Sequence, residues 1–172
     1  NTTANNNTAV GYQALTENAT GVQNTAIGSL ALDNNTGAGN LTAVGYSALG
    51  NNDGGGNTVA VGSFALASNS TGASNTAVGY RAAYSNSTTD NITAVGRDAL
   101  YSNTTGASNT AVGAYSMDAC TTGNNMTAVG LNALTSATTG THSDAFGISS
   151  LSAMTTGSYN IAYGNSSLAS VT

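Results

Sequence analysis

A strict internal repeat constrains this chain more than any other feature. The segment Asn7-Thr8-Ala9-Val10-Gly11 occurs in ten close copies, and each copy follows the previous one by 17 residues without insertion or deletion. A repeat this regular predicts identical units that bury their apolar side only by stacking on their neighbours. We therefore expect an all-β fold, a parallel β-solenoid or β-roll of ten 17-residue coils.

Each unit carries the same residue types in the same columns. Relative to the glycine, alanine stands two positions earlier in all ten copies, a bulky apolar residue, usually valine, stands one earlier, and threonine stands three earlier in seven copies. β-Branched residues favour strands, and a fixed glycine suits a corner that needs positive φ or close backbone approach. The alanine and glycine columns are predicted to be structural: Ala9, Gly11, Ala26, Gly28, Ala43, Gly45, Ala60, Gly62, Ala77, Gly79, Ala94, Gly96, Ala111, Gly113, Ala128 and Gly130.

The alternation of a strand places the threonine and valine columns on one face and the alanine and glycine columns on the other. Both faces carry a narrow set of residues, which predicts burial on both sides. We expect the threonine and valine face to point into the coil. The alanine face would then contact another surface, which identical chains arranged around an axis would supply.

The second half of each unit follows its own pattern. Two variable positions after the glycine lead to a small residue and then to the leucine column, which holds Leu in eight copies. We interpret the small residue and the leucine as a second short strand that places one large side chain inside each coil. Asparagine, threonine and glycine then supply turn chemistry. Stacked asparagines at a buried turn are predicted to form a hydrogen-bonded ladder: Asn18, Asn35, Asn52, Asn69, Asn86 and Asn103.

Residues 1–172 are expected to form a single solenoid domain. Because the chain opens and closes within a repeat, we expect it to be a fragment of a longer fibre. Residues 140–172 form atypical last coils, in which Phe146 and Tyr163 replace valine. Departures of this kind are typical of the end of a repeat array.

Composition narrows the classes of function. Two arginines and seven acidic residues give a net charge of -5, which offers no basic surface for nucleic acid. No stretch approaches the roughly 20 apolar residues that span a bilayer. A single cysteine excludes an intrachain disulfide and a cysteine-based metal site. The scattered acidic residues and the lone His142 form no recognisable catalytic or metal pattern, so we expect no enzyme, no cofactor and no metal.

The variable pair after each glycine is the best candidate for binding. Tyr12, Tyr46 and Tyr80 occupy one column on alternate coils, about 10 Å apart, where their rings could stack on sugars. The competing interpretation is that these residues are tolerated at an exposed corner or pack between chains. The candidate ligand-binding residues are Tyr12, Tyr46, Phe64, Tyr80, Arg81, Arg97 and Tyr115.

Residues 57–62, Asn-Thr-Val-Ala-Val-Gly, resemble a motif in the head domains of trimeric autotransporter adhesins. Residues 75–82 and 103–113 are similar to repeats of bacteriophage and algal-virus tail-fibre or surface-fibril proteins. The resemblance implies a left-handed, homotrimeric β-roll on a cell or virion surface. It implies an extracellular structural and adhesive module whose partners are other copies of itself and cell-surface glycan or matrix.

Four alternatives use the same repeat. The threonine column and the low charge suggest an ice-binding solenoid, which we rank lower because those threonines are expected to point inwards. A glycan-binding solenoid or a self-assembling extracellular filament would also fit. A polysaccharide lyase or hydrolase ranks last, because no cluster of acids or bases lies on adjacent coils.

Overall fold

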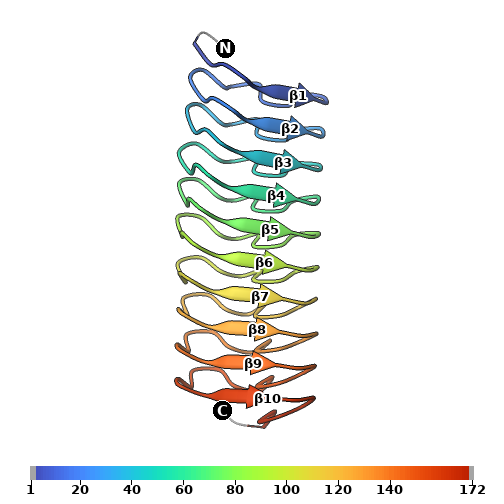
Figure 1. The fold of residues 1–172 in the computed structure, drawn as a ribbon, viewed down its shortest axis with the longest axis vertical. Helices are drawn as coiled ribbons and strands as arrows, with labels where there is room; N and C mark the ends of the chain where they lie inside the picture. The colour runs from blue at the N-terminus through green and yellow to red at the C-terminus, as the bar shows by residue number, and fades with distance from the viewer. Residues whose placement is uncertain (1–2, 171–172) are drawn as a thin grey trace.

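The structure, a computed structural model, describes residues 3–170 and shows ten short parallel strands in one column (Figure 1). Residues 1, 2, 171 and 172 of the predicted domain lie outside the described residues, and no helix occurs among the others. Each strand pairs with the next along the chain. The strands are β1 Thr8–Val10, β2 Thr25–Ile27, β3 Thr42–Val44, β4 Val59–Val61, β5 Thr76–Val78, β6 Thr93–Val95, β7 Thr110–Val112, β8 Thr127–Val129, β9 Asp144–Phe146 and β10 Ile161–Tyr163.

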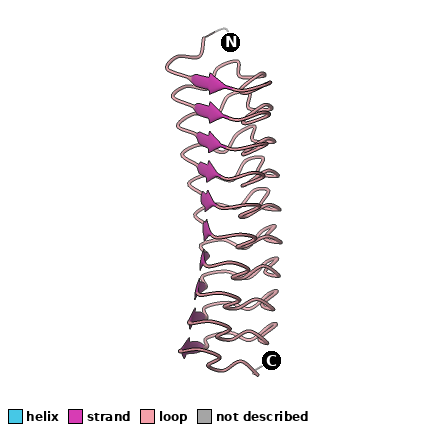
Figure 2. Cartoon of the chain, turned by 90° about the vertical axis from the view of Figure 1, so that its right-hand side faces the viewer, coloured by secondary structure: helices cyan, strands magenta, loops and turns pink. Residues whose placement is uncertain are grey.

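The strand register follows the repeat. Ala9 pairs with Ala26, and Ala26 pairs with Ala43, so equivalent residues of successive coils lie directly above one another. This confirms the predicted parallel β-solenoid with 17-residue coils. At about 4.8 Å per coil the stack makes a rod roughly 48 Å long. The column of strands turns gradually along the rod (Figure 2).

The alanine face of the strands points into the coil. Ala26, Ala43 and Ala60 have no exposed surface, whereas Val10 is 57% and Ile27 is 40% exposed. The prediction that threonine and valine face the interior is therefore wrong, and so is the assignment of the alanine face to contact with another chain. The alanines pack in the same core as the leucine column, and the coil is too narrow there for a larger residue on the strand side.

The leucine column is buried as predicted in the inner coils, where Leu32 and Leu66 have no exposed surface, whereas Leu15 is half-buried and Leu168 is exposed in the end coils. The predicted second strand is wrong, because these residues lie in turns with left-handed φ, such as +52° at Leu32. The residue two positions earlier is also left-handed, with φ of +59° at Leu30. The turns still join neighbouring coils: the Leu30 amide donates to the Tyr12 carbonyl (2.9 Å), and the Leu32 amide donates to the Ala48 carbonyl (3.1 Å).

The glycine column forms the predicted corner. Gly79 has a φ of +136°, a region that strongly favours glycine. A Cβ atom at Gly79 would also lie 2.5 Å from the carbonyl oxygen of Gly96 in the next coil. Glycine is therefore required here both by the backbone conformation and by the close stacking of the coils.

The asparagine column forms the predicted ladder inside the rod. Asn69 Nδ2 donates to Asn52 Oδ1 (2.8 Å), and Asn86 Nδ2 donates to Asn69 Oδ1 (3.0 Å). Five of the six amides, all but that of Asn52, also close their own turn, as when Asn69 Nδ2 donates to the Gly72 carbonyl (2.9 Å). The ladder ends where Cys120 takes the place of asparagine. No buried side-chain nitrogen or oxygen in residues 3–170 lacks a hydrogen-bond partner.

Replacing Asn69 with alanine tests the contribution of the ladder. The alanine fits, because Ala137 occupies the same column fully buried. The change leaves the Asn52 and Gly72 oxygens short of a donor, at about 1–3 kcal/mol for each unsatisfied group. We expect chemical denaturation to show a loss of at least about 2 kcal/mol in the free energy of unfolding.

The exposed Asn34 provides the matched control. The side-chain amide of Asn34 bonds only to the exposed Asn51 side chain. We therefore expect Asn34→Ala to change the free energy of unfolding by less than about 0.5 kcal/mol. Equal small losses for the two variants would show that the ladder does not stabilise the rod.

Candidate functional site

The single histidine and the single cysteine serve packing. The His142 ring stacks on Tyr159 with ring centroids 5.0 Å apart. Cys120 is buried, and burial raises the pKa of its thiol to about 11, so the thiol stays protonated at neutral pH. Among residues 3–170 no group of three or more His, Cys, Asp or Glu side chains is placed to hold a metal ion.

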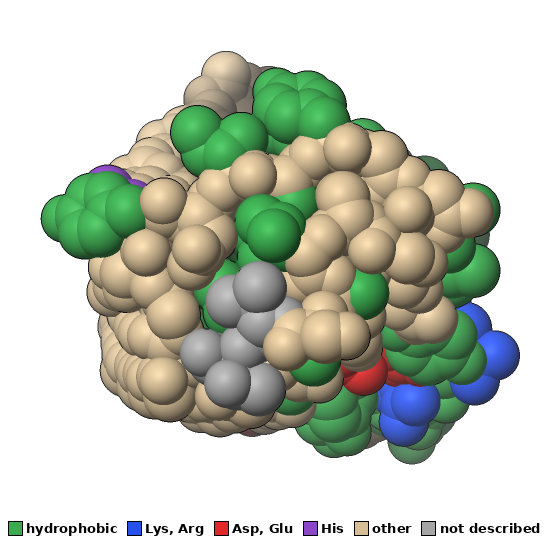
Figure 3. All heavy atoms as spheres, turned by 90° about the horizontal axis from the view of Figure 1, so that it is seen from below, with side chains coloured by type: hydrophobic (Ala, Val, Ile, Leu, Met, Phe, Trp, Pro, Cys, Tyr) green, Lys and Arg blue, Asp and Glu red, His purple; other side chains and the backbone are tan. Residues whose placement is uncertain are grey.

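A cluster of aromatic and charged side chains lies at one corner of the rod, next to the glycine column. These side chains come from the two variable positions after the glycine and from the position after the leucine. The small residue and the leucine that separate these positions are buried in the core. Seen along the axis, the arginines gather there beside hydrophobic side chains (Figure 3). We call this cluster the aromatic–arginine patch, and it consists of Tyr46, Phe64, Tyr80, Arg81, Tyr84, Arg97, Asp98, Tyr101 and Tyr115.

Four rings of the patch form a continuous run across neighbouring coils. Tyr46 meets Phe64 edge to face with centroids 5.0 Å apart, and Phe64 meets Tyr84 in the same manner at 6.3 Å. Tyr84 stacks on Tyr101 at 5.3 Å with an interplanar angle of 12°. Such contacts hold the rings in fixed orientations and leave Tyr46 with 47% of its surface exposed.

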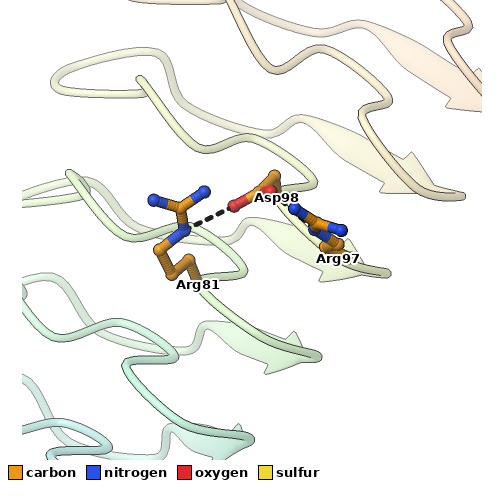
Figure 4. A network of polar contacts seen from close by, with 3 residues as sticks. All are labelled: Arg81, Arg97 and Asp98. Atoms are coloured by element: carbon orange, nitrogen blue, oxygen red, sulfur yellow. Dashed lines mark hydrogen bonds and ion pairs between the residues drawn. The ribbon is translucent and has the colours of Figure 1, made fainter.

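One buried carboxylate orders both arginines of the chain. Asp98 Oδ1 accepts a hydrogen bond from Arg81 Nε (2.8 Å) and Asp98 Oδ2 accepts one from Arg97 Nε (3.2 Å) (Figure 4). The Asp98 side chain is only 5% exposed, whereas that of Arg97 is 60% exposed. The hydrogen bond that Arg81 donates to Asp98 raises the pKa of Arg81. The patch therefore presents guanidinium groups in fixed positions.

Arg81 also lies between two tyrosine rings. Its guanidinium carbon is 4.9 Å from the Tyr80 ring centroid and 4.8 Å from that of Tyr101, within cation–π range. These three residues, with Phe64 and Tyr84, line a surface hollow of about 200 Å³. Pockets for drug-sized ligands enclose roughly 300–1,000 Å³, so this hollow is smaller than a typical ligand pocket.

The structure brings six of the seven predicted binding residues together in the patch: Tyr46, Phe64, Tyr80, Arg81, Arg97 and Tyr115. Tyr12 is 70% exposed and belongs to the first coil, two coils before Tyr46. Within the described residues no ring contact joins Tyr12 to the patch. Its predicted role in binding stays a prediction.

Sequence reasoning missed Tyr84 and Tyr101 as site residues. Both occupy the position after the leucine column, which we treated as part of the polar arc. Two tyrosines in the same column of successive coils were a usable signal, because in-register stacking brings such residues into contact. Asp98 lies in the variable pair with Arg97, and its role as the acceptor for both arginines follows only from the burial of its carboxylate.

Comparison of the chain with family models, with curated proteins and with solved structures gives no match. Within residues 3–170 the structure contains no helix of the length and apolarity needed to cross a bilayer.

Asp98→Asn tests whether the carboxylate holds the arginines. Asp98 has a φ of +55°, a conformation that asparagine adopts readily, so the backbone is preserved. Hydrogen bonds to a neutral acceptor are weaker, and we expect the Arg81 Nε–H proton to exchange with water about fivefold faster. The two arginines of the chain give two Nε signals in nitrogen-15 NMR, so each can be followed separately.

Asp118→Asn is the control for this measurement. Asp118 Oδ1 accepts a hydrogen bond from Thr135 Oγ1 (2.6 Å) and forms no ion pair with either arginine. Unchanged exchange in the Asp98 variant would mean that ring stacking alone orders Arg81.

Proposed function

We propose that this chain is a non-enzymatic structural and adhesive module of an extracellular fibre that attaches to glycans through the aromatic–arginine patch. The observation that carries the proposal is the run of partly exposed, mutually ordered rings around a hollow that contains Arg81. A stiff solenoid supplies length, and the patch supplies recognition at a defined height along it.

The chemistry of the patch suits a sugar. Aromatic faces pack against the C–H faces of sugar rings, and hydroxyl and guanidinium groups bond to sugar hydroxyls. The Tyr80, Tyr84 and Tyr101 hydroxyls make no hydrogen bond within the described chain, so they are free to bond to a ligand. Because the rings are already ordered by their contacts, binding loses little side-chain entropy.

The fibre part of the proposal includes association of copies of the chain as a homotrimer or filament at a cell or virion surface. The alanine face of the strands is buried inside the coils and is not available for contact with another copy. The contact between copies would therefore use the outward threonine and valine columns, which carry no charge in the first eight coils. Covering a face of this kind desolvates no charged group, and its threonine hydroxyls can bond across the contact.

Replacing Tyr80 and Tyr101 together with alanine tests glycan attachment. The change removes both rings that flank Arg81. On an array of immobilised bacterial, plant and animal oligosaccharides, we expect the parent chain to bind a defined subset and the variant to bind that subset about tenfold more weakly or worse. Tyr159→Ala is the control, since it removes an exposed ring outside the patch. No binding by the parent chain, or equal binding by all three proteins, would refute glycan attachment at the patch.

Ice binding is a second candidate function, favoured by the outward orientation of the threonine column. Thr76, Thr93, Thr110 and Thr127 lie in register about 4.8 Å apart, and their hydroxyls make no hydrogen bond within the described chain. β-Branched side chains have few rotamers, so such a row offers regularly spaced methyl and hydroxyl groups to water. The strand column turns along the rod (Figure 2), which limits a match to a flat ice plane to a few coils. Glycan attachment is therefore the stronger proposal.

Thermal hysteresis decides on the ice-binding candidate. If the threonine column binds ice, we expect the parent chain to depress the freezing point below the melting point and Thr93→Tyr to remove most of that gap, because the larger side chain interrupts the row. Thr105→Tyr, an exposed position on the polar arc, should leave the gap intact. Absence of hysteresis at high concentration would exclude ice binding, and light scattering on the same samples reports whether copies associate.

A further inference from the structure

We propose that the hollow beside Arg81 recognises the carboxylate of an acidic sugar residue, such as a uronic or sialic acid. The inference rests on the proposed attachment to glycans and names the class of glycan. It follows from which atoms of Arg81 are engaged, from what lines the hollow and from where positive charge is found in the chain.

The engaged atoms of Arg81 leave one edge of the guanidinium group available. Nε donates to Asp98 Oδ1 at 2.8 Å, and the two terminal nitrogens make no hydrogen bond to any described residue (Figure 4). Those two nitrogens carry parallel N–H groups that match the two oxygens of a carboxylate. A ligand carboxylate can thus bind to the two terminal nitrogens while Asp98 stays bonded to Nε.

The surroundings of Arg81 fix the direction of that edge. Tyr80 and Tyr101 contact the guanidinium group within cation–π distance, and its side chain is 33% exposed. Arg81 also belongs to the lining of the hollow, together with Phe64 and Tyr84. A sugar ring that packs on these aromatic side chains would carry its carboxylate to the terminal nitrogens of Arg81.

The charge distribution makes this position distinctive. The chain has a net charge of -5, and its only two Lys or Arg residues are Arg81 and Arg97. The rest of the rod therefore offers an acidic sugar no fixed cation. Arg97 lies over Tyr115 with its guanidinium carbon 5.3 Å from the ring centroid, and it is not part of the hollow. Arg81 is thus the cation that can act together with the hollow.

The test compares ligands with and without a free carboxylate. The probes are a tetramer of galacturonic acid and the same tetramer with every carboxyl group methyl-esterified, titrated by calorimetry into the intact chain at low salt. A hydrogen-bonded ion pair predicts about tenfold tighter binding of the acid than of the ester. Added salt should reduce this difference, because the site is partly exposed. Sialyllactose and lactose form a second pair that separates sialic from uronic acids.

Substitutions at the two arginines test whether Arg81 is responsible for the preference for the acid over the ester. Arg81→Gln is expected to abolish the difference between acid and ester while ester binding persists, and Arg81→Lys is expected to retain only part of it, because lysine lacks the planar fork. Arg97→Gln is the matched control and should keep most of the difference. Circular dichroism confirms that each variant retains the fold.

Each remaining outcome overturns the inference in a distinguishable manner. Equal affinity of the parent chain for acidic and neutral members of both pairs would refute carboxylate recognition and leave glycan attachment standing. Equal losses in Arg81→Gln and Arg97→Gln would refute the assignment to the hollow. Failure to bind any of these probes, combined with an empty oligosaccharide array, would refute glycan attachment itself.

Discussion

In-register stacking of the coils is the interaction on which the rest of this structure depends. Backbone amides and carbonyls bond along the rod axis in strands and turns alike. Inside, the asparagine amides repeat the same connection with side chains. Both sets of bonds require that every coil has the same length, because a one-residue shift would place unlike side chains above one another. The constant 17-residue period is thus the physical condition for the fold.

The features that the sequence predicts well are those that depend on one column at a time. The glycine corner follows from the freedom of glycine at positive φ, and the ladder follows from six asparagines in one column. Which strand face points inwards depends instead on the width of the coil. Alternation separates alanine from threonine and valine but gives no information on that width. The left-handed turns at residues such as Leu32 could not be predicted from the sequence either, because leucine has little intrinsic preference for that conformation.

The candidate site shows the same division. Six predicted residues share the corner beside the glycine column, so stacking alone brings them together. The role of Asp98 could not be predicted, because it depends on a buried carboxylate that serves two arginines on neighbouring coils. Tyr84 and Tyr101 approach the corner only because the turn between them and the glycine folds its two middle residues into the core. Such placement depends on three-dimensional turn geometry, which composition and periodicity do not specify.

Equal coil height has a consequence for how far the patch can stand from either end of the rod. The contacts of the patch join only neighbouring or nearly neighbouring coils, from Tyr46 in the third coil to Tyr115 in the seventh. Gain or loss of a whole coil outside this block would shift the patch by one step of about 4.8 Å and leave its internal geometry unchanged. The position of the patch along the rod and its internal geometry are therefore separable in this architecture, and coil number alone adjusts the position.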